Sequence, residues 1–358
     1  MVDWLAGKRV RGTSSERTSL GTTTIGGTGV GGWVELGRTT LESAGDLITV
    51  SGLSDKRYYM ILENHTNVTS TLNGGWQFNS DTGSNYAQRS SDNGGGDGTL
   101  TSITRIPADW GAATEHVFQV NYISNLSSNE KLFQGHMNVA TATGAGTAPS
   151  RRENTGKWAN TSNAISSIRM NNVSGSGDYN TGSEVVVLGW DPADTHTNNF
   201  WEELASTELT VAGDDLSSGT IPAKKYLWVQ AWYKNDGAAD INNLTRFNGD
   251  AGSNYTSRYS INGAADVTRT SRTWLDIESG GQDAKMLNMF IINNASNEKL
   301  VIYHQMDFGA AGAANAPNRR EGVGKWANTS NQITEINLKQ LDAGDYAAGS
   351  ILKVWGAD

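Results

Sequence analysis

The chain contains no cysteine. Disulfide bridges, thiolate metal ligands and cysteine nucleophiles are therefore excluded, and stability must come from packing and backbone hydrogen bonds. Proline is scarce, with 5 among 358 residues, and charged residues make up only 18%. The sequence contains no apolar run long enough to span a bilayer and no apolar segment near its start. It therefore predicts neither a transmembrane helix nor a secretory signal.

Positive charge is also in short supply, because the formal net charge is −9. A general nucleic-acid binder needs a basic face that displaces counterions. The composition thus argues against a nucleic-acid partner. Glycine is abundant, at 42 positions, and serine, threonine and asparagine are frequent. This composition favours many short strands joined by polar turns over long helices.

The most informative feature present is an internal repeat. Residues 156–163 and 324–331 both spell GKWANTSN, and residues 128–132 and 296–300 both spell SNEKL. Both pairs are separated by 168 positions. Two copies that stay in register over such a length share one fold, and each copy is long enough to be a whole domain.

The repeat divides the chain into four segments. We predict an extended N-terminal arm at residues 1–32, a first copy at 33–191, a linker at 192–200 and a second copy at 201–358. The arm is rich in glycine, threonine and serine and cannot bury enough apolar surface to fold alone. It is either a disordered tail or an arm that orders on a partner. Its candidate partner-binding residues are Trp4, Leu5, Lys8, Arg9, Arg11 and Arg17.

Short runs of alternating or continuous apolar residues predict the strands. In the first copy we expect them at residues 33–38, 58–63, 71–78, 86–91, 99–106, 116–123, 131–140, 151–158, 164–171 and 184–190. The second copy repeats this pattern. Such closely spaced strands, without intervening helices, predict an all-β fold with two tandem antiparallel β-sandwich domains, jelly-roll-like in character.

Candidate sites are few, and each has a structural alternative. His136 and His304 correspond between the copies, but no metal-binding or catalytic motif accompanies them, which favours a structural role. Paired arginines within residues 149–153 and 317–321 suit either bidentate anion binding or salt bridges between strands. Trp158 and Trp326 are candidate glycan contacts, because indole rings stack on sugars, although they equally suit a sandwich core.

The remaining polar loops give weaker signals. Residues 92–98 resemble part of a calcium loop but lack its bidentate glutamate, so we interpret them as a hairpin turn; Asp81 and Asp250 remain candidates for weak Ca²⁺ binding. No nucleophile motif is present, and a glycosidase carboxylate pair is not recognisable from sequence. We therefore predict no catalytic residue, no metal site and no cofactor.

Several segments resemble a known class of proteins. Residues 151–163 and 319–331, the Phe78, Tyr86 and Arg89 set, and residues 4–17 and 186–194 resemble the repeats of virion structural proteins of tailed phages, especially marine phages. The resemblance implies a non-enzymatic virion protein, either a tail appendage or fibre-type component or a capsid decoration protein. It implies assembly in the host cytoplasm.

The resemblance also bears on partners. With the composition of the arm, it implies docking of residues 1–32 onto other capsid or tail proteins, with formation of a homo-oligomer. One alternative is a glycan-binding adhesin that contacts a host surface glycan. A polysaccharide-degrading enzyme is a less favoured alternative.

Overall fold

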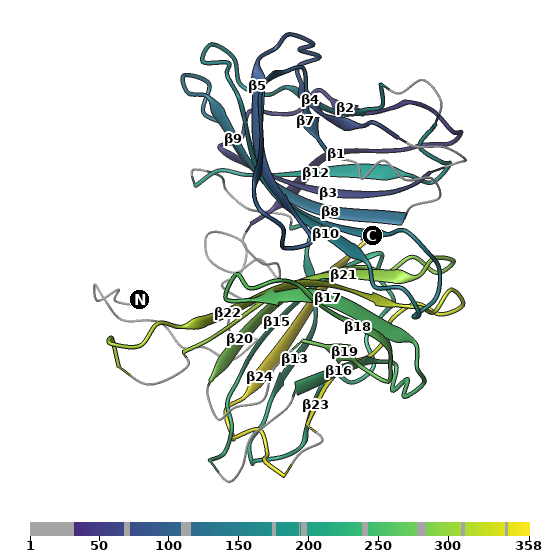
Figure 1. Ribbon diagram of the computed structural model, residues 1–358, viewed down its shortest axis with the longest axis vertical. Coiled ribbons are helices and arrows are strands. Elements are labelled where there is room, and N and C mark those ends of the chain that lie inside the picture. The colour runs from purple at the N-terminus through teal and green to yellow at the C-terminus, as the bar shows by residue number, and fades with distance from the viewer. Residues whose placement is uncertain are drawn as a thin grey trace, which may run out of the picture.

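The computed structural model describes residues 32–358, apart from residues 68–71, 109–115, 174–176, 193, 195–198, 238–242, 278–283, 309–311 and 341–342. All elements of regular structure in this part of the chain are strands and isolated bridges. They form two modules, stacked one above the other in Figure 1. The all-β class and the tandem sandwich arrangement that the sequence predicts are confirmed.

The described part of the first module contains twelve antiparallel strands in two sheets. The larger sheet has the order β1-β12-β3-β8-β9-β10-β5-β6 and the smaller has the order β2-β11-β4-β7. The strands are β1 (Val34–Thr40), β2 (Leu47–Ser51), β3 (Tyr58–Thr66), β4 (Gly75–Phe78), β5 (Tyr86–Asp92), β6 (Gly98–Ile103), β7 (Ile106–Pro107), β8 (His116–Ser124), β9 (Lys131–Ala140), β10 (Ser150–Trp158), β11 (Ser167–Asn171) and β12 (Glu184–Trp190).

The second module repeats this topology strand for strand. Its larger sheet has the order β13-β24-β15-β20-β21-β22-β17-β18 and its smaller sheet the order β14-β23-β16-β19. The strands are β13 (Glu202–Glu208), β14 (Asp215–Ser217), β15 (Tyr226–Tyr233), β16 (Asn243–Phe247), β17 (Tyr255–Ile261), β18 (Val267–Arg272), β19 (Leu275–Asp276), β20 (Lys285–Ile292), β21 (Lys299–Asp307), β22 (Asn318–Trp326), β23 (Ile336–Gln340) and β24 (Ile351–Ala357).

The predicted strands of the first copy agree closely with these bounds. Two of them, β9 and β12, begin and end at the predicted residues, and most others shift by one to three positions. Strand β2 lies outside the predicted ranges, and the predicted strand at residues 99–106 corresponds to two strands, β6 and the short β7. Each module packs its two sheets face to face around its own apolar core. Alternate residues of the larger sheet, such as Ile61 and Val187 or Val229 and Val354, point into these cores.

The repeated peptides GKWANTSN and SNEKL interlock within each module. Lys131, from SNEKL, is fully buried, and its Nζ donates to the carbonyl oxygen of Asn160 over 2.8 Å. The same ammonium lies 5.7 Å from the centre of the Trp158 ring. Lys299, Asn328 and Trp326 repeat the arrangement. A buried ammonium needs such partners, so the strictest repeats in the sequence maintain structure.

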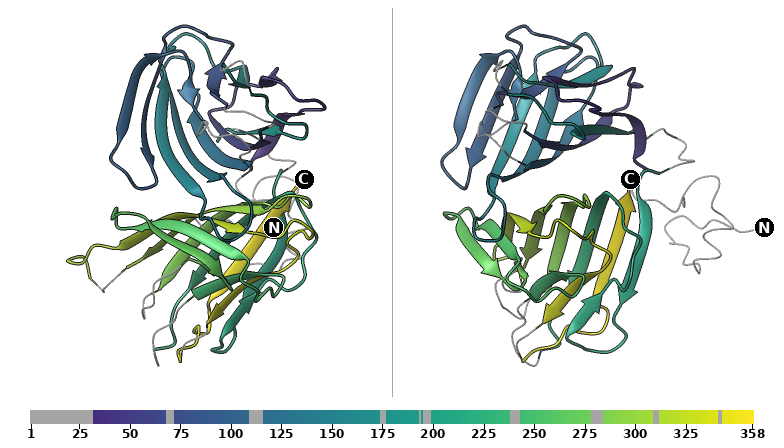
Figure 2. Two further views of the ribbon diagram at one scale, coloured as in Figure 1. Left: turned by 45° about the vertical axis from the view of Figure 1, so that its right-hand side comes forward. Right: turned by 90° about the vertical axis from the view of Figure 1, so that its right-hand side faces the viewer.

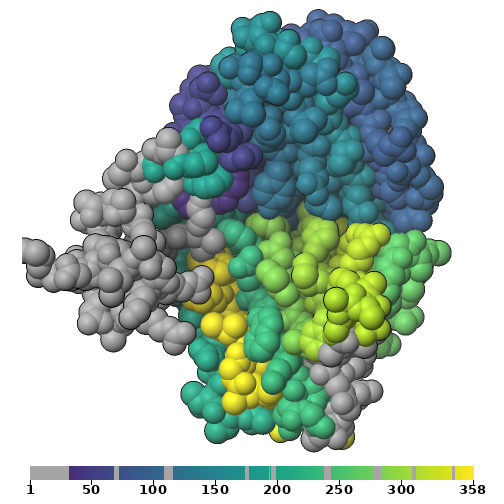
Figure 3. Space-filling view, turned by 90° about the vertical axis from the view of Figure 1, so that its left-hand side faces the viewer, coloured from purple at the N-terminus to yellow at the C-terminus, as the bar shows by residue number. Residues whose placement is uncertain are grey.

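A third apolar core joins the two modules. Met60, Leu62 and Phe118 of the first module's larger sheet belong to one buried cluster with residues of the second module's larger sheet. Phe118 and Tyr226, for example, have ring centres 6.5 Å apart. Figure 3 shows the two modules in continuous contact along one side. The modules therefore form one body rather than projecting separately.

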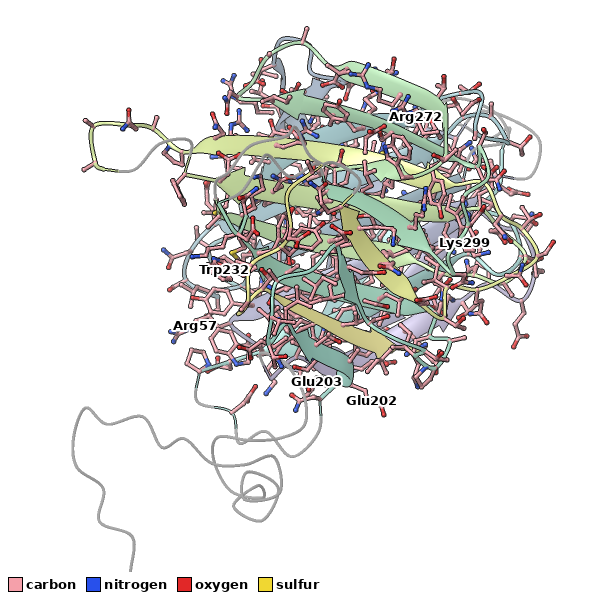
Figure 4. All side chains as sticks on the ribbon, turned by 90° about the horizontal axis from the view of Figure 1, so that it is seen from below. Arg57, Glu202, Glu203, Trp232, Arg272 and Lys299 are labelled. Atoms are coloured by element: carbon pink, nitrogen blue, oxygen red, sulfur yellow. The ribbon has the colours of Figure 1, made fainter. Side chains whose placement is uncertain are left out.

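The join explains a feature of β12. Its central residues, 185–188, are all apolar and all buried, because one side of the strand faces the core of its own module and the other faces the second module. The equivalent strand β24 has Lys353 at the position of Val186. Lys353 is about one-third exposed and pairs with Glu203, labelled in Figure 4. The two copies thus use the same sheet face differently.

Candidate functional site

The outer face of the first module's larger sheet carries an open groove of about 820 Å³. Strands β3, β8, β9, β10, β5 and β6 form its floor, and every residue that lines it belongs to the first module. A concave pocket of this size with mixed apolar and polar lining is the usual form of a binding site. It is the candidate functional site of the described chain.

Aromatic rings line one end of the groove. Tyr58 stacks on Trp190, with ring centres 5.4 Å apart and planes inclined by 20°. Trp33 lies 6.4 Å from Trp190 and 6.5 Å from Tyr122. Three strands, β3, β8 and β12, and the segment before β1 therefore bring these rings together towards one edge of the sheet. Tyr58 is 37% exposed, so its ring is available to a ligand.

The other end of the groove is more polar. Its exposed lining includes Gln134, Thr155, Arg89 and Lys157. The Nζ of Lys157 lies 2.8 Å from Glu130 Oε2, and Arg89 lies 3.4 Å from Asp97, with all four side chains 40–60% exposed. Exposed ion pairs of this kind contribute little to stability. These groups are consequently available to exchange their partners for a ligand.

The equivalent face of the second module is closed. The second module has Leu300 at the position of Leu132. It has Ile302 and Val323 in place of Gln134 and Thr155. Leu132 is 58% exposed, whereas Leu300 is fully buried and the other two are almost so. The first copy keeps this surface polar and open. The second copy uses the equivalent surface as an apolar contact with the first module.

The hairpin between β9 and β10 covers this face of the second module, and its main-chain groups form hydrogen bonds with side chains there. Lys325 Nζ donates to the Ala142 carbonyl over 2.6 Å, and Arg258 Nε donates to the Pro149 carbonyl over 2.8 Å. Gly144 N donates to Glu298 Oε1 over 2.5 Å. These bonds satisfy main-chain groups that would otherwise lose water on burial. The join thus includes a hairpin that side chains of the second module hold by its backbone.

A buried ion pair crosses the join beside this hairpin. Arg151 donates to both carboxylate oxygens of Asp266, over 2.7 to 3.1 Å, and both side chains are less than 5% exposed. The neighbouring Arg152 pairs with Asp92 on β5, Arg319 with Glu321, and Arg320 lies over the Tyr259 ring. The paired arginines therefore have intramolecular partners, as the salt-bridge interpretation expects, and one of them connects the modules.

The corresponding histidines also meet at the join. His136 and His304 have ring centres 4.4 Å apart. Burial lowers the pKa of His136 to about 3 and that of His304 to about 4, and the nearby Arg151 acts in the same direction. Neutral imidazoles fit a covered contact between two sheets. The two rings pack against each other where the modules meet, as the structural interpretation of these histidines expects.

These histidines predict acid destabilisation. An unfolded histidine titrates near pH 6.5, so below that pH the unfolded chain binds more protons than the folded chain. The contribution of these histidines to the free energy of unfolding is fully present above about pH 6.5. It is expected to fall continuously as the pH decreases towards 4. Burial also lowers the pKa of His116 to about 3, which adds to the trend, whereas the raised pKa of buried Glu153 opposes it.

Urea titrations between pH 7.5 and 5 measure the effect. The double variant His136→Gln/His304→Gln is expected to lose a clear part of the slope of stability against pH. An unchanged slope in that variant would mean that the two rings are solvated, which contradicts the join.

The predicted glycan contacts at Trp158 and Trp326 are wrong in this structure. Both indoles are 1% exposed and lie within the cores of their modules. Trp158 Nε1 donates to Asp81 Oδ2 and Trp326 Nε1 to Asp250 Oδ2, each over 2.7 Å. A ring enclosed on both faces has no surface for a sugar. Exposed aromatic surface is found instead in the groove, for example at Tyr58.

The other predicted sites have plain outcomes. Trp4, Leu5, Lys8, Arg9, Arg11 and Arg17 lie outside the described residues. Residues 92–98 form the β5–β6 hairpin turn, as expected. Burial opposes ionisation of Asp81, but hydrogen bonds from Trp158, Asn85 and Gly83 outweigh it and lower its pKa. Within the described residues, no group of three or more His, Asp or Glu side chains is placed to hold a metal ion, and no helix is suited to spanning a membrane.

Comparisons with known proteins add little. No protein-family model matches the sequence, and no curated protein matches it. Among solved structures, domains LG4-5 of the mouse laminin alpha1 chain are 10% identical, with 91% of this chain and 90% of that chain covered and a TM-score of 0.18. Neisserial surface protein A is 6% identical, with 80% and 99% covered and a TM-score of 0.11. The sheet topology establishes the fold, and these likenesses carry no functional argument.

Proposed function

We propose that this protein is a non-enzymatic structural component of a tailed-phage virion, either a tail appendage or fibre-type component or a capsid decoration protein. The observation that carries the proposal is the join, in which the first module's β9–β10 hairpin covers the outer face of the second module's larger sheet. Two sandwiches connected by an apolar core and a buried ion pair form a single stiff unit. The resemblance of the repeated motifs to virion proteins supports the same role.

In this proposal the arm attaches the body to other capsid or tail proteins. The assembled protein would be exposed on the virion after its production in the host cytoplasm. Residues 1–32 would order only where a neighbour buries Trp4 and Leu5 and pairs with the basic residues that follow.

Deletion of residues 1–32 tests the attachment. We expect the truncated chain to fold, because both cores lie in residues 33–358, and to be absent from purified particles. Circular dichroism and thermal unfolding of the truncated protein are the control for folding. Incorporation at full occupancy would show that docking does not depend on the arm.

A glycan-binding adhesin is the second candidate, and the groove is the observation that favours it. Stacked aromatic rings beside exposed hydroxyl, amide and cationic side chains suit a sugar. The adhesin candidate predicts a specific glycan-array signal that Tyr58→Ala abolishes and Val211→Ala, a change at a residue of the second module that is 71% exposed, retains. No signal from the folded protein would exclude it.

A further inference from the structure

The two modules carry matching hairpins, of which one is inserted in the join and the other is exposed. Gly144 and Gly312 occupy the same position in the two hairpin tips and share a positive φ, 81° and 93°. Each is followed by an alanine, and the prolines at positions 149 and 317 also correspond. Ala145 is 9% exposed in the join, whereas residues 312–317 are all exposed. Figures 1 and 2 show the coloured part of the β21–β22 hairpin, which leaves out residues 309–311, extending away from its module.

The polar groups that hold the inserted hairpin have identical counterparts in or beside the open groove. Lys325, Glu298 and Arg258 contact the hairpin backbone in the second module. The first module has Lys157, Glu130 and Arg89 at these positions. Lys325 and Glu298 are 0% and 9% exposed beneath the hairpin, whereas Lys157 and Glu130 are 45% and 40% exposed. The same three-residue set that holds a hairpin in one module is therefore open in the other.

The exposed apolar side chains show the same division. Of the eleven large apolar side chains that are exposed in the described chain, Tyr58, Leu100 and Leu132 line the groove. The first module covers the second with one part of its outer sheet face. Four others of the eleven lie on or beside the corresponding part of the second module: Trp232, Met286, Met306 and Phe308. Trp232 pairs with Met286 across the sheet, and Met286 pairs with Met306. We call these four residues the apolar patch; Figure 4 labels Trp232.

The apolar patch is the counterpart of a surface that is already buried. The positions of Met286, Met306 and Phe308 correspond to Phe118, Asn138 and Ala140 of the first module. Phe118 and Ala140 belong to the core of the join, and Asn138 donates to the Val301 and Gly324 carbonyls. An exposed patch of large apolar side chains marks an interaction surface. Here its partner surface has a precedent within the same chain.

We propose that the groove of the first module binds residues 312–317 of the β21–β22 hairpin and the apolar patch of a second copy of this chain. This contact between two molecules has the same form as the contact between the two modules of one molecule. Each chain offers one groove and one hairpin, so two chains can exchange them reciprocally in a closed dimer, or successive chains can continue the contact. The proposal deepens the assembly role proposed above.

The intermolecular contact should be the weaker of the two. The groove has Gln134 and Thr155 where the join has Ile302 and Val323, so two apolar contacts are lost. Met306 stands at the position of Asn138, so the two hydrogen bonds that Asn138 donates are also lost. A contact between separate chains also loses translational freedom that the covalent tandem does not lose. We therefore expect reversible association that depends on protein concentration.

Sedimentation or light scattering of the purified full chain over a range of concentrations tests the proposal. We expect a shift from one chain to two or more as the concentration rises. Leu132→Arg in the groove and Ala313→Arg in the hairpin tip are each expected to weaken association at least tenfold. Val211→Arg is the matched control, because Val211 is 71% exposed on the second module and lies outside the patch, and it should associate normally.

A mixture of the two deficient variants sharpens the test. The Leu132→Arg chain keeps an intact hairpin and the Ala313→Arg chain keeps an intact groove, so the mixture should regain association through one contact. A chain that is monomeric at every concentration would overturn the proposal, as would association that neither variant weakens. Glycan binding in the groove of a monomeric chain would overturn it in favour of the adhesin. None of these results affects incorporation into particles, which tests the proposed function separately.

Discussion

Asp266→Asn is expected to lower the free energy of unfolding by about 3–5 kcal/mol, because it removes the buried bidentate counter-charge of Arg151 and leaves only the more exposed Glu153 beside its guanidinium. The pair is bidentate, with Nη2 of Arg151 2.7 Å from Oδ1 of Asp266, and the two side chains are 4% and 3% exposed. Arg258, 3.9 Å from the same carboxylate, also loses a partner. Asparagine keeps the shape of the side chain and removes only its charge.

The repeat provides a matched control for this substitution. Asp97 is the equivalent residue of the first module and pairs with Arg89 over 3.4 Å, but these side chains are 52% and 60% exposed. Asp97→Asn is therefore expected to change stability by less than about 1 kcal/mol. Urea unfolding of both variants at neutral pH measures the difference. Equal losses in the two variants would mean that Asp266 is as solvated as Asp97 and that the modules do not meet there.

Trp158→Ala is expected to destabilise the protein by about 3–5 kcal/mol, because it leaves a large cavity in the core of the first module. The Trp158 ring packs on Phe78 and Tyr86, with ring centres 5.9 and 6.4 Å away. The substitution also leaves Asp81 without its indole donor and uncovers the buried ammonium of Lys131. Trp326→Ala removes the same set of contacts from the second module and is expected to cost a similar amount.

Trp158→Phe separates packing from hydrogen bonding. It keeps an aromatic ring in the core but removes the Nε1 donor to Asp81, so it should cost about 1–3 kcal/mol, less than the alanine variant. Thermal or urea unfolding is the measurement, and sugar binding should not change separately from folding. A Trp158→Ala protein of unaltered stability that has lost a glycan ligand would restore the surface role that burial excludes.

The fold could be predicted because the repeat constrains it twice. Strands such as β9 and β12 alternate or continue apolar residues over seven to ten positions, which is enough to define their ends. The short strand β2 was missed because five residues give little pattern. Its partner β11 lies about 120 positions away, so the pairing that makes it a strand is not a local property.

The glycan site was predicted at the wrong residues for a related reason. The environment of Trp158 depends on Asp81, 77 positions away, and no local pattern reveals that contact. A usable signal did exist in the differences between the copies. Gln134 against Ile302 and Thr155 against Val323 mark one surface that is polar in the first copy and apolar in the second. Positions that change polarity between otherwise similar copies indicate surfaces that have changed their surroundings.

The absence of cysteine allows a direct measurement of this asymmetry. Leu132→Cys and Leu300→Cys place single thiols at equivalent positions, of which the first is 58% exposed and the second fully buried. Reaction with a thiol reagent should be as rapid as for a free thiol at position 132 and at least about a hundredfold slower at position 300, when each protein is diluted to single chains. Similar rates at the two positions, or faster reaction at position 300, would contradict the arrangement in which the first module covers the second and keeps its own groove open.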